Sequence, residues 1–116
     1  MVYNKVSGNR VWATSDQGDI MTALELVRKK RDDILRLAAS YGAQNVRIFG
    51  STARGEDTPS SDIDFLVTME PGRSLLDKAG LLVDLKELLG REVDVVEDDN
   101  IYWLLRRRIL KEARPV

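Results

Sequence analysis

Residues 49–67 read FGSTARGEDTPSSDIDFLV, and the rest of the chain is organised around this stretch. A short apolar run at residues 46–49 predicts a buried strand, which stops at Gly50 and Ser51. A strand that turns into a helix here leaves backbone N–H groups without partners inside the helix. These groups, with the positive end of the helix dipole, suit a phosphate. The first half of the stretch therefore predicts a phosphate cradle.

The second half of the stretch predicts a pair of carboxylates on a strand. Residues 63–68 are mostly apolar, and the strand period of two places Asp62 and Asp64 on one face. Close carboxylates repel each other, so either one is protonated or a divalent cation neutralises both. Magnesium is the expected cation, because it is usually held by one or two carboxylates plus substrate phosphate oxygens. Taken alone, Gly50-Ser51 also fits a plain turn, and Asp62-Ile63-Asp64 also fits a solvated strand entrance. Their occurrence together in this order favours a functional site.

A third carboxylate is expected on a later strand. Residues 91–97 read as a strand in which Val93 and Val95 point one way and Asp94 the other. If this strand pairs with residues 63–68, Asp94 completes a cluster with the first two carboxylates. The alternative is that Asp94 is a partly exposed residue of an edge strand.

Composition narrows the chemistry available to the chain. Its 116 residues, 43% apolar and 32% charged, indicate one globular domain. No apolar run approaches the roughly 20 residues that span a bilayer, and residues 1–20 lack the apolar centre of a signal peptide. The absence of cysteine fits a cytoplasmic protein. Because histidine is also absent, a histidine triad and a typical zinc site are excluded.

The charges are unevenly distributed, although the net charge is −1. Residues 1–55 carry nine basic and five acidic side chains, residues 56–100 carry four and thirteen, and residues 101–116 carry five and one. An acidic middle disfavours broad contact with phosphate backbones, so direct nucleic-acid binding is not indicated. A cation-dependent site suits this distribution better.

Three helices are expected around the strands. Capping-box spacings at Thr22 and Ser74 predict helices over about 22–41 and 74–89, and a last helix is expected over about 101–113. The expected buried face of the second comprises Leu75, Leu76, Ala79, Leu82, Val83 and Leu89. In the last helix, Ile101, Leu104, Leu105 and Ile109 are expected to pack on the sheet. Its other faces carry Tyr102, Trp103 and Leu110 beside Arg106, Arg107 and Arg108, a composition favoured at protein interfaces.

Residues 1–20 show no periodicity. We expect an N-terminal extension over residues 1–20, ordered or disordered, followed by a single domain over residues 21–116.

The Gly50-Ser51 pair, ten intervening residues and then Asp62-Ile63-Asp64 resemble the signature of the DNA polymerase β-like nucleotidyltransferases, and most closely their minimal nucleotidyltransferase branch. The resemblance covers about residues 22–112. It implies an α/β (α+β) fold, a small mixed β-sheet flanked by helices. It also implies transfer of a nucleoside monophosphate from a triphosphate to an acceptor hydroxyl.

The resemblance further implies roles for individual residues. Asp62, Asp64 and Asp94 would bind magnesium, with two ions expected, and Asp94 would help to activate the acceptor. Gly50 and Ser51 would cradle the triphosphate of ATP, and Arg54 could neutralise charge on the leaving pyrophosphate.

In larger members of that family a further domain selects the acceptor, and we expect no such domain in residues 1–116. Stand-alone members resemble antitoxins of two-gene modules whose partner is a small helical HEPN ribonuclease, which implies a hetero-oligomer and AMP transfer to a toxin tyrosine. Two alternatives stay open. One is an antitoxin that neutralises its toxin by binding alone, and the other is a small-molecule nucleotidyltransferase subunit of the antibiotic-modifying type.

Overall fold

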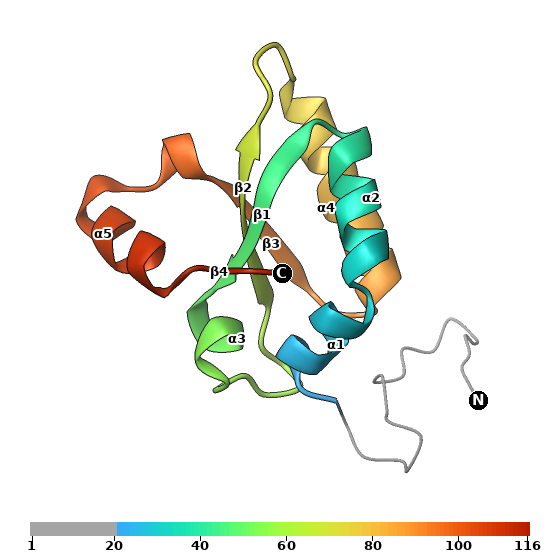
Figure 1. Cartoon of the computed structure of the whole chain (residues 1–116), viewed down its shortest axis with the longest axis vertical. Helices are drawn as coiled ribbons and strands as arrows, with labels where there is room; N and C mark the ends of the chain where they lie inside the picture. Colours follow the sequence, from blue (N-terminus) through green and yellow to red (C-terminus); the bar gives the residue numbers. More distant parts are fainter. Residues whose placement is uncertain (1–20) are drawn as a thin grey trace.

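The computed structural model describes residues 21–116, and the expected extension over residues 1–20 lies outside this range. Four strands form one mixed sheet in the order β3-β2-β1-β4 (Figure 1). β1 is antiparallel to both β2 and β4, whereas β2 and β3 are parallel. The strands are β1 (Ala43–Phe49), β2 (Ile63–Met69), β3 (Val93–Glu97) and β4 (Arg114–Pro115). The expected small mixed sheet is confirmed.

Helices lie on both sides of the sheet. α2 and α4 run side by side on one side, and α5 stands on the other (Figure 1). The helices are α1 (Ala23–Lys29), α2 (Arg31–Ser40), α3 (Gly50–Arg54), α4 (Leu75–Leu89) and α5 (Trp103–Glu112), with a 3-10 turn η1 (Asp98–Asn100). None of the helices within residues 21–116 is long and apolar enough to cross a membrane.

The main core lies between the sheet and the α2/α4 layer. The central strands contribute Ile48 and Phe65, and the helices contribute Ile34, Leu81 and Leu85, all at most 1% exposed. These positions follow the two periodicities of the sequence, two along strands and about four along helices. The opposite face of β2 and β3 carries Asp64, Thr68 and Asp94 together with the apolar Leu66 and Val96.

The expected helix over about 22–41 is two helices. The capping box at Thr22 is confirmed, but the helix ends at Lys30 and α2 begins at Arg31. Every side chain between Val27 and Ile34 is charged, so no buried residue holds a straight helix across this point. Acidic side chains in the first turn of α2 favour a new helix start.

The capping box at Ser74 and the expected end of the helix at residue 89 are confirmed, but most of the expected buried face of α4 is wrong. The residues that α4 buries are Leu81, Leu85 and Leu89, one turn apart. Leu75, Leu76 and Val83 lie at other angles around the helix and are 77%, 81% and 54% exposed.

The last helix also differs from expectation. α5 buries none of its residues, and Leu104 and Leu105 are 59% and 46% exposed rather than packed on the sheet. After α5 the chain forms β4, which no sequence pattern predicted, and pairs with β1 through Arg114 and Pro115. Proline is tolerated there because β4 is an edge strand.

Candidate active site

Two of the expected carboxylates lie side by side on the face of the sheet opposite the main core. The parallel register of β2 and β3 places Asp64 beside Asp94, and Val93 and Val95 point into the core instead. Asp62 lies two residues before Asp64 at the start of β2 and is exposed. The expected pairing of the two strands is thus confirmed.

The expected cradle directly adjoins these carboxylates. β1 pairs with β2 so that Phe49 lies opposite Asp64, and the chain then turns into α3 at Gly50. Gly50 has φ +70°, and a Cβ atom there would lie 2.5 Å from Asp64 Oδ2. Glycine is therefore required on two grounds, the left-handed backbone and the closeness of the carboxylate.

The environment of Asp64 disfavours its charge. Its pKa is raised from 3.8 to about 6, first by burial and then by the charges of Asp94 and Asp62, while Arg54 opposes them. A carboxyl that resists ionisation without a nearby cation is typical of functional sites.

The two anion donors of the cradle are already bonded to a side chain of α5. Glu112 Oε1 accepts a hydrogen bond of 2.9 Å from the Gly50 N–H. Arg54 Nη1 lies 3.1 Å from Glu112 Oε2, and Arg54 Nε donates to Glu56 Oε1 at 2.9 Å. These bonds, to Glu56 first and then to Glu112, raise the pKa of Arg54 above its ordinary value.

The helix dipole that we expected to favour phosphate is small here, because α3 has five residues. The donors that bind the Glu112 carboxylate are one backbone N–H and one guanidinium. Affinity for an anion at this position thus comes from direct hydrogen bonds and the Arg54 charge.

A cleft of about 350 Å³ lies between α3 and α5 beside these groups. Its lining residues are Phe49, Gly50, Ser51, Arg54, Asp64, Leu105, Arg108, Ile109 and Glu112. Four residues expected at the site, Gly50, Ser51, Arg54 and Asp64, thus share one cleft. Sequence reasoning did not identify Arg108 or Glu112 as site residues. The one signal for Glu112 was that it is the single acidic side chain in the basic segment 101–116.

A buried ion pair fixes the loop that leads from the cradle to the carboxylates. Arg91 Nη1 lies 3.3 Å from Asp57 Oδ2, and the two side chains are 2% and 4% exposed. Arg91 Nη2 also donates to the carbonyls of Thr58 and Ser61, at 2.7 and 2.8 Å. This pair, also missed from the sequence, sets where β2 and therefore Asp64 begin.

The donor set fits magnesium. The carboxylates are oxygen ligands, the type that this ion prefers, and Gly50 keeps the space beside Asp64 free of a side chain. Within residues 21–116, no three acidic side chains converge closely enough to form a metal cage by themselves. Magnesium commonly takes its remaining ligands from water and substrate phosphate, so a substrate-completed site is consistent with this arrangement.

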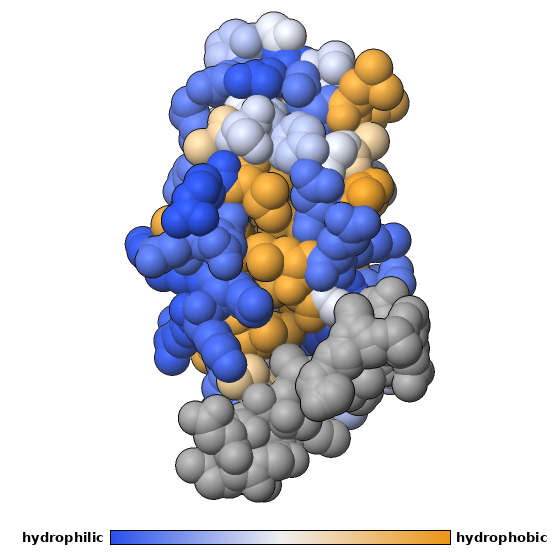
Figure 2. Space-filling model, turned by 90° about the vertical axis from the view of Figure 1, so that its right-hand side faces the viewer, coloured by the Kyte–Doolittle hydropathy of each residue, from blue (hydrophilic) through white to orange (hydrophobic). Residues whose placement is uncertain are grey.

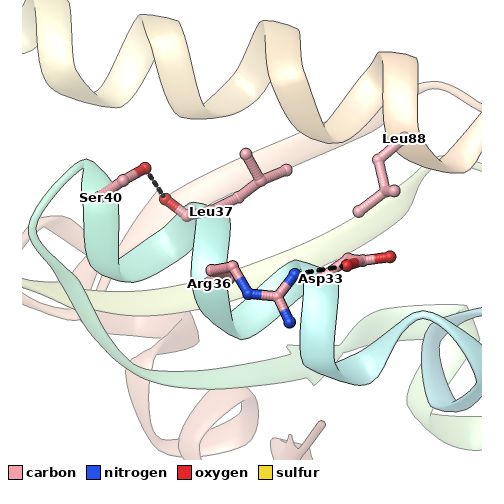
Figure 3. A pocket seen from close by; sticks show the side chains of 5 residues that line it. All are labelled: Asp33, Arg36, Leu37, Ser40 and Leu88. Carbon is pink, nitrogen blue, oxygen red and sulfur yellow. Dashed lines mark hydrogen bonds and ion pairs between the residues drawn. The ribbon is translucent and has the colours of Figure 1, made fainter.

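A second depression lies on the far side of the sheet, between α2 and α4. Figure 2 shows this side of the molecule, where a hydrophobic strip runs between hydrophilic borders. Leu37 and Leu88 face each other there, and Asp33, Arg36 and Ser40 form one rim (Figure 3). The polar groups of the rim bond within α2, as in the Arg36–Asp33 pair at 2.8 Å. The α3/α5 cleft is therefore the better candidate for catalysis.

Comparison with known proteins gives a single family. Residues 24–116 match the family described as nucleotidyltransferase domain. A Methanocaldococcus jannaschii protein, named provisionally as a protein adenylyltransferase, is 44% identical over 93 residues, 80% of this chain and 96% of that protein. The protein adenylyltransferase MntA of Thermococcus cleftensis is 36% identical over 77 residues, 66% of this chain and 78% of that protein.

Solved structures share the fold. One described provisionally as a minimal nucleotidyltransferase has a TM-score of 0.74 at 47% identity, covering 80% of this chain and 95% of that chain. Another, described as a tri-AMPylated Shewanella oneidensis HEPN toxin in complex with an MNT antitoxin, has a TM-score of 0.58 at 19% identity, covering 76% and 69%.

Proposed function

The chain belongs to the nucleotidyltransferase domain family and is a nucleotidyltransferase, and on this basis we propose that it is an antitoxin that transfers AMP from ATP to a hydroxyl of a partner protein. The acceptor is a tyrosine of a cognate HEPN ribonuclease toxin. The names of the M. jannaschii and T. cleftensis relatives support the adenylyl group and the protein acceptor. The toxin partner is supported by the antitoxin complex that shares this fold.

One observation carries the proposal. The Asp64 carboxylate adjoins the turn at Gly50 so closely that no side chain fits between them, and Asp94 lies opposite Asp64 on the next strand. A triphosphate held at this turn would therefore lie against the carboxylates. Groups that bind phosphate and groups that bind a cation are needed together for phosphoryl transfer.

The proposed role of each residue follows from where its side chain or N–H group lies. The Gly50 and Ser51 N–H groups hold the phosphates, and the Arg54 guanidinium stabilises negative charge on the leaving pyrophosphate. Asp94, which is exposed and lies opposite Asp64 in the register of β2 and β3, would accept the proton of the acceptor hydroxyl. The acceptor oxygen bonds to the α-phosphorus, the bond from that phosphorus to the bridging oxygen breaks, and pyrophosphate leaves.

Asp62, Asp64 and Asp94 would hold magnesium. When bound, magnesium supplies positive charge that neutralises the phosphates and the developing charge of the transfer. Burial, and then repulsion from Asp94 and Asp62, raise the pKa of Asp64, so a bound cation would favour its ionised form.

The exposed surface of α5 supports a protein acceptor. Tyr102, Trp103 and Leu104 are 59%, 73% and 59% exposed, and the basic side chains of Arg106 to Arg108 lie among them. Leu105 and Arg108 of the same helix line the cleft. A protein bound to α5 could therefore present a tyrosine to the site.

The test is the intact mass of the HEPN partner after incubation with this chain, ATP and Mg²⁺. A mass increase by whole AMP units is expected with the wild-type chain and not with Asp64→Asn. An Asp99→Asn variant, which changes an exposed carboxylate outside the cleft, should modify the partner normally.

Two results would contradict the proposal. A stable complex without any mass change, and with equal neutralisation of the toxin by Asp64→Asn, would indicate an antitoxin that acts by binding alone. AMP transfer to an aminoglycoside-type small molecule and none to the protein would indicate the antibiotic-modifying alternative.

A further inference from the structure

The side chain of Glu112 occupies the part of the cleft that the proposed function gives to phosphate. Glu112 Oε1 accepts from the Gly50 N–H at 2.9 Å, and its two oxygens lie 3.3 and 3.1 Å from Arg54 Nη1. One carboxylate thus uses both donors at once. A backbone N–H and a guanidinium in this arrangement would bind a phosphate oxygen equally well.

This is an unfavourable place for a carboxylate apart from those two donors. The Asp64 carboxyl lies on the same cleft wall, and the Glu112 charge is among the causes that raise its pKa, after burial and the other aspartates. Glu112 is itself largely buried, its side chain being 20% exposed. The residue therefore adds negative charge beside a cluster that already repels it.

The element that carries Glu112 is weakly attached. No residue of α5 is buried, so little apolar surface holds the helix against the core. β4 follows directly and pairs with β1 over two residues, Arg114 and Pro115. Beyond β4, Val116 packs against the core and its N–H donates to the Val46 carbonyl, so the chain end is anchored. Segments with few buried apolar contacts open at low free energy, so α5 itself can move without unfolding the domain.

We propose that Glu112 is an internal competitor of the nucleotide, which occupies the phosphate position on Gly50 and Arg54 and is displaced when a triphosphate binds. This inference rests on the proposed function, because it assigns the triphosphate to the same cleft. Displacement frees the Arg54 guanidinium for phosphate and moves one negative charge away from the carboxylates. Arg108, on the cleft wall beside Glu112, adds a second cation near the phosphates.

The proposal predicts the direction in which a change of Glu112 alters the affinity for nucleotide. Part of the binding free energy of the nucleotide is used to release Glu112, so the apparent affinity is reduced by the fraction of molecules in which the cleft is open. Glu112→Gln keeps the size of the side chain and removes its charge, which weakens the bond to Arg54. The variant should therefore bind nucleotide more tightly than the wild-type chain.

The experiment is calorimetric titration of the full chain with a non-hydrolysable ATP analogue in excess Mg²⁺. We expect Kd to fall about tenfold in Glu112→Gln, the effect of an open fraction that rises from about one in ten to nearly all molecules. Glu87→Gln, an exposed carboxylate on α4, is the matched control and should leave Kd unchanged. An unchanged or higher Kd in Glu112→Gln would overturn the inference, and a higher one would mean that Glu112 positions Arg54 instead.

Failure of the proposed function gives a different result. If the wild-type chain and both variants fail to bind the analogue, the nucleotide site itself is wrong, and the inference falls with it. If all three bind with equal Kd, only the competition is refuted.

Hydrogen exchange provides a second readout that needs no variant. In the wild-type chain, binding of the analogue should speed amide exchange in the last turn of α5 and in β4, because Glu112 has left the cleft. Slower exchange there on binding would show that α5 closes over the nucleotide with Glu112 in place and would overturn the proposal.

Discussion

Replacement of Asp64 by asparagine should make the cation-free protein more stable while it abolishes AMP transfer. Burial is the largest cause of the raised pKa of the Asp64 carboxyl, and the charges of Asp94, Asp62 and Glu112 add to it. Because the folded pKa lies above the ordinary value, folding disfavours the ionised carboxylate. The neutral amide of Asn has a similar size and does not suffer this penalty.

The magnitude follows from the two pKa values. The difference between 3.8 and about 6 corresponds to at most about 3 kcal/mol of unfolding free energy. Asp64 is half-buried, so screening by water reduces this to about 1.5 kcal/mol. Well below pH 3.8 the carboxyl is protonated in both states and the variant gains nothing. The gain should grow between about pH 4 and pH 6 and stay constant above that range.

The assay is urea unfolding of wild type and Asp64→Asn with EDTA present, at pH 4, 5, 6 and 7.5. Glu87→Gln serves as a control for the loss of one exposed charge. A variant that is no more stable than wild type at pH 7.5, or that shows the same difference at pH 4, would refute the argument that the site is destabilised by its own charges.

Two further perturbations test the geometry of the site. Gly50→Ala should destabilise the fold by about 1–2 kcal/mol more than Gly55→Ala in urea unfolding. Both glycines have positive φ and share the backbone strain, but a Cβ at Gly50 would meet a carboxylate oxygen and one at Gly55 would meet nothing within 4 Å. Equal losses would contradict the clash. Arg91→Met should cost about 3–5 kcal/mol, because it leaves the Asp57 carboxylate buried without its ion pair. The double variant with Asp57→Asn should recover much of that loss, and no recovery would mean that the packing of Arg91 matters more than its charge.

The sequence was sufficient to predict the central strands and the carboxylates that they carry. Local signals were enough there: Gly50 after an apolar run, alternation at Asp62 and Asp64, and an aspartate between valines at position 94. Strand periodicity decides which side a residue faces, and the parallel pairing then brings Asp64 and Asp94 together.

What the sequence could not predict depends on packing between distant segments. The leucines of α5 have helical spacing like those of α4, and no local pattern shows that α5 lies outside the core. Glu112 reaches Gly50 across 62 residues, and Arg91 reaches Asp57 across 34. Such pairs depend on tertiary placement, which composition and periodicity do not determine.

The Arg91–Asp57 pair also links three segments of the chain that are far apart in the sequence. Asp57 Oδ2 accepts from the Ala23 N–H at 3.0 Å as well as from Arg91, so the start of α1, the loop before β2 and the entry to β3 share one carboxylate. None of the three can open alone without leaving that buried charge short of a partner. Spontaneous opening of the loop should thus coincide with detachment of α1, so that both behave as a single cooperative foldon rather than as independent flexible ends.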